Sequence, residues 1–118
     1  MQFNNQQSVY SQITDYLKKQ IFSGVYEAGQ KMPAIRELAV MLKVNPNTVV
    51  RAYSDLESEG LIYTESTNGK FVINDTEFLQ KSKINYIKKI ATEFSEITKE
   101  CKISNQEIMS IMEEIYGK

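Results

Sequence analysis

The chain has 118 residues, of which 42% are hydrophobic and 25% are charged, and its formal net charge is −1. This length suits one domain with a short appendage, and it excludes a roomy enzyme cleft combined with a separate regulatory domain. The sequence has no histidine and no glycine-rich phosphate-binding motif, so we expect a protein that is not an enzyme, with no catalytic residues, metal site or cofactor.

The first predicted helix runs from about residue 8 to residue 23. Its apolar residues recur at every fourth position, which is the spacing of one buried helix face, and they are Val9, Ile13, Leu17 and Ile21. Gly24 is placed to end this helix, which we interpret as a scaffold helix. A polar connection over residues 25–32 follows, and Pro33 opens the next segment.

The second predicted helix, residues 34–42, is short and amphipathic. Its apolar side chains stand at helical offsets of 0, 3, 4 and 7, and they are Ile35, Leu38, Ala39 and Leu42. Ala34 stands where a side-chain cap would help the helix, and the lack of one costs on the order of 1 kcal/mol. Lys43 and Val44 then form a very short turn.

The third predicted helix begins at Asn45 and Pro46. An asparagine side chain accepts hydrogen bonds from unpaired backbone donors, and a proline at the first helical position loses only an N–H that has no partner there. The buried spacing falls on Val49, Ala52, Tyr53 and Leu56. The side chains turned away from the core are therefore Asn47, Thr48, Arg51 and Asp55. A capped helix with small polar residues near its start can reach DNA base edges.

A tight hairpin follows the third helix at once. Gly60 ends the helix in the left-handed conformation, and strands are predicted at residues 61–63 and 71–73. The pair Asn68 and Gly69 suits the two central positions of a type I′ turn. Two short helices and a hairpin in this order predict a winged helix-turn-helix, a mainly α fold with a small β-hairpin that lays one helix in a DNA groove.

The charge of the predicted winged domain is balanced. Residues 1–74 carry seven Lys or Arg and seven Asp or Glu, whereas DNA-binding domains usually have a basic footprint. DNA binding therefore requires the cations to gather on one face, and these cations are Lys31, Arg36, Lys43, Arg51 and Lys70. The balance keeps a second interpretation open, a winged-helix protein-interaction module that does not bind DNA.

Residues 75–118 contain no proline, and no glycine before Gly117, and they predict two helices. A narrow apolar seam steps by three and four residues through Ile87, Ile90, Phe94, Ile97 and Cys101. Ser104 and Glu107 form a capping box for a shorter helix with an apolar side, which carries Ile108, Ile111, Met112 and Ile115. Such helices have no core of their own, so they must pack on the winged domain, on a second copy or on another protein. We favour a homodimer, in which residues 1–74 bind DNA and residues 75–118 form a dimerisation arm. The predicted contacts of this arm are the apolar residues just named, with the exception of Cys101.

The single cysteine and the lack of a long apolar run bear on the compartment. Cys101 cannot form an internal disulfide, which fits a reducing compartment. We expect its side chain to be a small buried apolar group rather than a redox sensor. The sequence has no charged-then-apolar leader and no long apolar stretch, so we expect a cytoplasmic protein that does not insert into a membrane.

Several motifs between residues 8 and 73 occur in a fixed order, and they are VYSQI (9–13), GVYEAGQKMP (24–33), IRELA (35–39), NPNTV (45–49), RAY (51–53), LE (56–57), EGLI (59–62) and GKFV (69–72). Together they resemble the N-terminal domain of GntR-type bacterial transcriptional regulators. The NPNTV run and the short helical tail are most similar to the YtrA-type subfamily. Members of that subfamily carry two small helices for dimerisation in place of a large effector-binding domain.

The resemblance implies a homodimer that binds double-stranded operator DNA, usually as a repressor and often of transport genes. Carried over position by position, it implies that Arg36 contacts phosphate or base. Asn45, Asn47 and Thr48 would start the recognition helix in the major groove, and Arg51 would lie near the DNA backbone. Without the resemblance, the sequence favours equally a weak surface ion pair between Arg36 and its neighbour Glu37.

The resemblance also implies that Gly69 and Lys70 bring the wing to the minor groove. Two departures from the family pattern concern this surface. Ala34 replaces a frequent serine, and residues 66–70 read STNGK where the family often has Arg-Gly-Lys-Gly-Thr, which leaves fewer wing cations. No convergent polar set indicates a small-molecule effector, whose pocket would have to lie at the dimer interface or between the arm and the winged domain.

Overall fold

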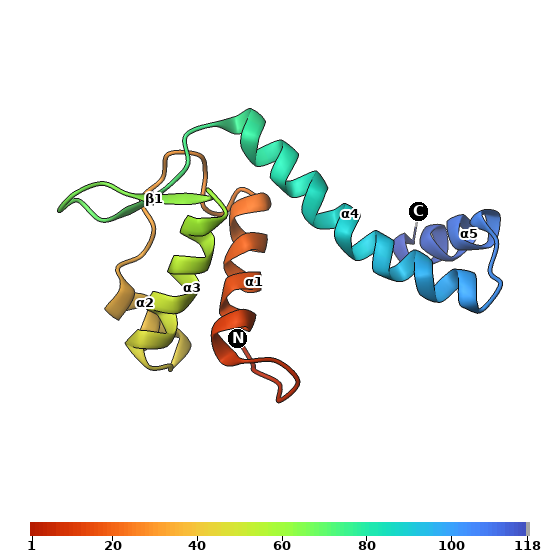
Figure 1. Cartoon of the computed structure of the whole chain (residues 1–118), viewed down its shortest axis with the longest axis horizontal. Coiled ribbons are helices and arrows are strands. Elements are labelled where there is room, and N and C mark those ends of the chain that lie inside the picture. The colour runs from red at the N-terminus through yellow and green to blue at the C-terminus, as the bar shows by residue number, and fades with distance from the viewer. Residues whose placement is uncertain (118) are drawn as a thin grey trace. The chain divides into compact units, whose positions relative to one another are not determined.

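The computed structural model describes residues 1–117, which contain five helices and one two-stranded sheet (Figure 1). In chain order the elements are α1 (Val9–Phe22), α2 (Ile35–Leu42), α3 (Pro46–Ser58), β1 (Ile62–Thr64), β2 (Lys70–Val72), α4 (Thr76–Glu100) and α5 (Asn105–Tyr116). This order confirms the predicted winged helix-turn-helix with two following helices. Contacts divide the chain into one unit over residues 1–81 and a second unit that begins at Ser82. No helix in the described part combines the length and apolar character that crossing a membrane requires.

The core of the first unit lies between its three helices and the hairpin. α1 contributes Ile13, Leu17 and Ile21, as their spacing predicts, and α3 contributes the four predicted residues Val49, Ala52, Tyr53 and Leu56. Val9 shares the spacing of α1 but is 39% exposed, because it is the first residue of the helix. Ser8 caps α1 by accepting a hydrogen bond from the Ser11 N–H at 3.4 Å.

The turn between α2 and α3 depends on one left-handed residue. Lys43 has φ +57°, and its N–H bonds back to carbonyls of the last turn of α2. Glycine is the usual residue in this conformation, because it has no Cβ to crowd the backbone. The left-handed residue lets the chain leave α2 and reach the N-cap of α3 at Asn45 within two residues.

The hairpin is antiparallel, with Ile62 opposite Val72 and both side chains buried. Tyr63 and Phe71 face each other across the strands, and their ring centroids are 5.9 Å apart. Each strand is shifted by one residue from the predicted range. β1 includes Thr64 but not residue 61, and β2 includes Lys70 but not residue 73.

The turn at the tip of the wing differs from the predicted one. The Asn68 N–H donates to the Glu65 carbonyl at 2.8 Å, so Ser66 and Thr67 occupy the centre of the turn. Positive φ angles occur at Ser66 (+46°) and Gly69 (+104°), but not at Asn68. The type I′ turn predicted at Asn68 and Gly69 is therefore wrong. The Glu65 N–H donates to the Gly69 carbonyl, and this hydrogen bond closes the loop at the base of the turn.

The connection before α2 runs along the outer side of β2. The Met32 N–H donates to the Lys70 carbonyl at 2.8 Å, and Lys31 forms an antiparallel bridge with Phe71. These bonds place the segment 30–32 beside the wing.

The first turns of α4 belong to the winged unit. The Asp75 carboxylate accepts a hydrogen bond from the Phe78 N–H at 3.0 Å and so caps the helix. Phe78 packs so close to Gly60 that a Cβ there would lie 3.2 Å from the ring atom Cζ, and Leu79 packs on the core. Contacts therefore divide the chain inside α4, after residue 81, whereas the sequence-based domain proposal ends the first domain at residue 74.

The second unit begins within α4 and includes α5. The capping box is confirmed, because the Ser104 N–H donates to the Glu107 carboxylate at 3.1 Å and the Glu107 N–H donates to the Ser104 hydroxyl at 3.2 Å. These bonds lower the pKa of Glu107. Cys101 is exposed, so the expectation of a buried cysteine is wrong. It lies one residue beyond the end of α4, where the turn towards α5 begins.

Candidate nucleic-acid interface

The start of α3 presents polar side chains outward. The Asn45 side-chain oxygen accepts a hydrogen bond from the Asn47 N–H at 2.8 Å, and Pro46 occupies the first helical position, as predicted. Asn47 is exposed and Thr48 is half-buried. The four buried residues on the opposite side of α3 fix the rotation of the helix about its axis. The polar side is therefore held outward.

Two residues predicted to face away from the core contact α1. The guanidinium carbon Cζ of Arg51 lies 3.8 Å from the ring centroid of Tyr10, which is a cation–π contact. Asp55 is half-buried and accepts a hydrogen bond from the Thr14 hydroxyl at 3.3 Å. Arg51 is exposed as a whole residue, but Tyr10 covers one face of its guanidinium.

Lys70, the predicted wing cation, is held by side chains of its own domain. Its Nζ forms an ion pair with Glu57 of α3 and donates a hydrogen bond to the Thr64 hydroxyl at 2.7 Å. The hydrogen bond from Lys70 holds the pKa of Glu57 below its usual value. The pair ties the hairpin to α3.

The lowered pKa of Glu57 makes the stability of the winged domain depend on pH. The carboxylate is favoured by folding, so its contribution is present above the unfolded pKa of about 4.3 and is lost as the pH falls through the lower folded pKa. We expect the difference in unfolding free energy between wild type and Glu57→Gln to be largest near pH 7 and to shrink towards pH 3. Urea unfolding at a series of pH values measures this difference.

Lys70→Met is the matched partner variant for this prediction. The effect of Glu57→Gln on the unfolding free energy is then measured in the Lys70→Met background. There it should depend less on pH, because Glu57 has already lost its partner. Equal pH dependence in wild type and in Glu57→Gln would show that the ion pair adds nothing to stability.

Lys31 lies beside the wing. It is one of the cations that the sequence requires on the DNA-binding face, but it is not among the individual predicted DNA contacts. Gly69 has φ +104°, and a Cβ at this position would come 3.2 Å from Cε of Lys31. The two residues also line one hollow between the wing and the start of α2. The backbone bridge between Lys31 and Phe71 brings this lysine to the wing, and no local sequence pattern shows such a bridge.

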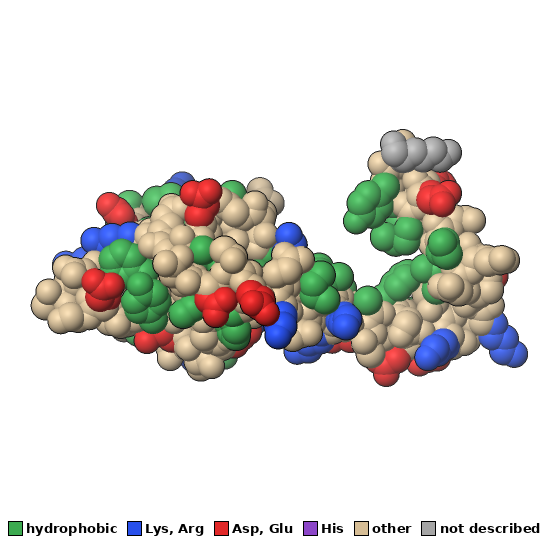
Figure 2. All heavy atoms as spheres, turned by 90° about the horizontal axis from the view of Figure 1, so that it is seen from above, with side chains coloured by type: hydrophobic (Ala, Val, Ile, Leu, Met, Phe, Trp, Pro, Cys, Tyr) green, Lys and Arg blue, Asp and Glu red, His purple; other side chains and the backbone are tan. Residues whose placement is uncertain are grey.

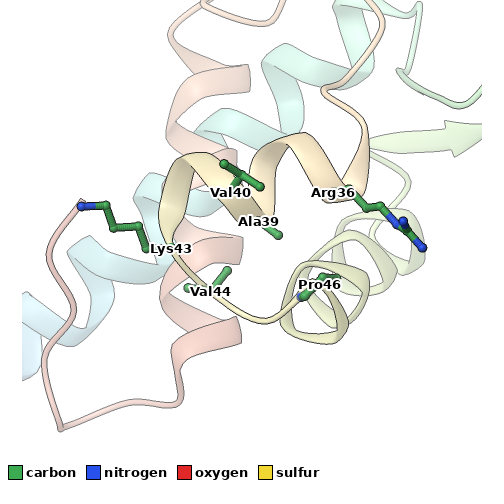
Figure 3. Close-up of a pocket in the computed structure, with 6 residues that line it drawn as sticks. All are labelled: Arg36, Ala39, Val40, Lys43, Val44 and Pro46. Carbon is green, nitrogen blue, oxygen red and sulfur yellow. The ribbon is translucent and has the colours of Figure 1, made fainter.

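A second hollow lies between α2 and the start of α3. In Figure 3, Arg36 and Lys43 extend in opposite directions from the two ends of α2. The side chains that line the hollow with them are apolar, and they are Ala39, Val40, Val44 and Pro46. Both cations are exposed. Among the described residues neither forms an ion pair, so both are available to phosphate groups.

Tyr53 holds the start of α2 against α3. Its hydroxyl donates to the Pro33 carbonyl at 2.7 Å, directly before the N-cap of α2. The side chain is buried, and burial raises the pKa of Tyr53 well above its usual value. Tyr53 therefore positions the first turn of α2, from which Arg36 projects.

Some of the cations of the winged domain are already held by partners within the domain. On the face shown in Figure 2, basic and acidic side chains are interspersed. Three of the seven cations in residues 1–74 have partners within the domain, because Lys18 pairs with Glu59 at 2.8 Å, Lys70 pairs with Glu57 and Arg51 stacks on an aromatic ring. The cations left to meet DNA near α2 and the wing are Lys31, Arg36 and Lys43.

A match to a known protein family covers the three helices and the hairpin of the winged domain. The family described as "Bacterial regulatory proteins, gntR family" matches residues 9–72, which extend from the first residue of α1 to the last residue of β2. The chain belongs to the GntR family. This membership confirms the resemblance inferred from the ordered motifs.

The GntR protein is similar to known regulators over most of its length. The transcriptional regulator YhcF of Bacillus subtilis, itself uncharacterized, is 30% identical over 108 residues, which are 92% of this chain and 89% of YhcF. The transcriptional repressor YtrA of the same organism is 37% identical over 81 residues, 68% of this chain and 62% of YtrA. The structure of a GntR family transcriptional regulator from Listeria monocytogenes has a TM-score of 0.91 at 32% identity and covers 95% of this chain and 98% of that one.

These similarities decide between the two interpretations left open by the charge balance. GntR proteins are DNA-binding transcriptional regulators and not enzymes, and this chain shares both their sequence motifs and their winged fold. The balanced net charge is therefore compatible with a DNA-binding domain.

Proposed function

We propose that this GntR protein is a homodimeric repressor that acts in the cytoplasm, with two copies of α3 in successive major grooves of a pseudo-palindromic operator. Residues 1–74 bind DNA, and residues 75–118 hold the two copies together. The exposed, capped start of α3 carries the proposal, because Asn47 faces outward while the opposite side of the helix is buried. The resemblance to YtrA-type regulators suggests transport genes as targets.

The DNA contacts come from α2, the start of α3 and the wing. From the sequence we propose Arg36, Asn45, Asn47, Thr48, Arg51, Gly69 and Lys70, and the position of Lys31 beside the wing adds this lysine. Arg36 and Lys31 are exposed and form no ion pair among the described residues, so they are the proposed phosphate contacts. Lys70 can contribute only where a phosphate competes with Glu57 for its ammonium group.

The apolar side of the arm supports a dimer. In the single chain Ile87 is 53% exposed, Phe94 42% and Ile97 61%, and Ile115 of α5 is 69% exposed. Figure 2 shows hydrophobic side chains gathered along the arm. Burying such surface is favourable by roughly 25 cal/mol per Å². A second copy presents the same seam, and the proposed contacts are Ile87, Ile90, Phe94, Ile97, Ile108, Ile111, Met112 and Ile115.

Selection from a random DNA library with the full-length protein tests the proposal. We expect an enriched motif with two-fold symmetry, whose half-sites lie about one helical turn apart or slightly more. Affinity for this motif should fall steeply with salt, because two copies double the number of phosphate contacts. Enrichment of an asymmetric motif, or of none, would count decisively against the proposal.

Arg36→Ala is expected to weaken operator binding by about 1–3 kcal/mol, whereas Glu114→Ala should have little effect. Arg36 projects from the first turn of α2 beside α3, while Glu114 is an exposed residue of α5. Fluorescence anisotropy with labelled operator at fixed salt measures both affinities. Equal losses in the two variants would show that the DNA-contacting face is misassigned.

A further inference from the structure

The outward side of α3 carries an apolar residue where DNA contacts are expected. Asn47, Val50, Arg51 and Ser54 lie three or four positions apart and therefore share one side of the helix. Val50 is 45% exposed. A β-branched residue is a poorer helix former than alanine, so helix propensity does not account for a valine at this half-exposed position.

The same side of α3 lacks a mobile cation. Arg51 is the only Lys or Arg in the helix, and its guanidinium stacks on Tyr10 of α1 at 3.8 Å. Guanine is most often read in the major groove by arginine or lysine that reaches its O6 and N7 atoms. A guanidinium held against α1 is poorly placed for this contact. On this side of the first two turns of α3, the side chains left to read bases are Asn47, through its amide, and Val50, through its methyl groups.

Both of these groups match A·T pairs. An asparagine amide can pair with N6 and N7 of adenine, and an apolar side chain can pack on the C5-methyl group of thymine. Residues three apart on a helix are about 5–6 Å apart, while successive bases of one strand are about 3.4 Å apart along the axis. Asn47 and Val50 can therefore lie over neighbouring base pairs.

We propose that Val50 is a specificity-determining residue that packs on the C5-methyl group of a thymine in each half-site, next to an adenine read by Asn47. The proposal rests on the DNA-binding function proposed above and extends it to the base pairs that α3 selects. It assigns an A·T-containing step to the part of each half-site that α3 contacts.

Uracil substitution tests the contact directly, because uracil differs from thymine only by the missing methyl group. In the selected operator each thymine is replaced by uracil in turn, and binding of the full-length protein is measured by anisotropy at fixed salt. We expect one thymine position per half-site at which the change weakens wild-type binding by about threefold to fivefold, the value of one buried methyl group. Val50→Ala should bind the thymine operator with a similar loss and should show no further loss with uracil.

Val25→Ala is the matched control. Val25 is 58% exposed and lies in the connection after α1, so this variant should bind as wild type does and should keep the uracil effect. If uracil is neutral at every position, or if Val50→Ala remains sensitive to it, the inference is wrong while DNA binding stands. If selection recovers no operator at all, the proposed function itself falls, and the inference falls with it.

Discussion

Phe94→Glu is expected to make the protein monomeric and to lower its affinity for the operator by about 100-fold or more. Phe94 lies in the middle of the α4 seam and is 42% exposed in the single chain. A carboxylate at this position would be buried without a partner in the proposed dimer, which costs several kcal/mol. Two half-sites bound by one dimer gain avidity of about 10²–10⁴, and a monomer loses this gain. Sedimentation velocity measures the oligomeric state, and anisotropy measures the affinity.

Lys89→Glu is the control for this variant. Lys89 is exposed and lies five residues before Phe94, about 140° around the same helix, so the same acidic residue is introduced away from the seam. This variant should remain dimeric. If Phe94→Glu also remains dimeric, the seam is not the interface. If the wild type is itself monomeric at concentrations that saturate the operator, the proposal of a dimeric repressor is wrong.

The parts of the fold that were predicted from sequence are those fixed by neighbours in the chain. Asn45 with Pro46, and Ser104 with Glu107, cap their helices through bonds between residues only two or three positions apart. The buried side of α3 follows from helical spacing alone. Capping and periodicity are local chemistry, so a single sequence is sufficient to read them.

The details that were missed depend on residues far apart in the sequence. Arg51 is turned towards α1 by Tyr10, and Lys70 is drawn to Glu57 rather than left at the wing surface. Lys31 is brought to the wing by its backbone bridge with Phe71, which lies beyond the helix-turn-helix in the sequence. Each of these pairings changes which cations can meet DNA, and none has a local signal.

The prediction of the turn at the tip of the wing was wrong for a different reason. Asn68 with Gly69 is a strong local signal for a two-residue turn, but the pairing of β1 with β2 leaves five residues between the strands. The turn then forms at Ser66 and Thr67, and Gly69 supplies a positive φ where the chain returns to β2. The register of the strands, fixed by Ile62 opposite Val72 in the core, therefore overrides the local turn preference.

The recognition helix depends on its buried side as much as on its exposed side, and Leu56→Ala tests this dependence. Leu56 is fully buried in the core between α3 and the rest of the winged domain. Truncation of a buried leucine removes its transfer free energy and leaves a cavity, so we expect the free energy of unfolding to fall by about 2–5 kcal/mol. Urea unfolding followed by circular dichroism at 222 nm measures the change, at one protein concentration because dimerisation stabilises the folded chain.

Met41→Ala is the matched control, since methionine loses a side chain of similar size and Met41 is 66% exposed on α2. Its effect should stay within about 0.5 kcal/mol. Domain stabilities are commonly only 5–15 kcal/mol, so the loss in Leu56→Ala should also raise the unfolded fraction during operator binding. If both variants lose the same stability, the side of α3 opposite Asn47 is not the anchor of the helix. The outward orientation of its polar residues would then lack its physical cause.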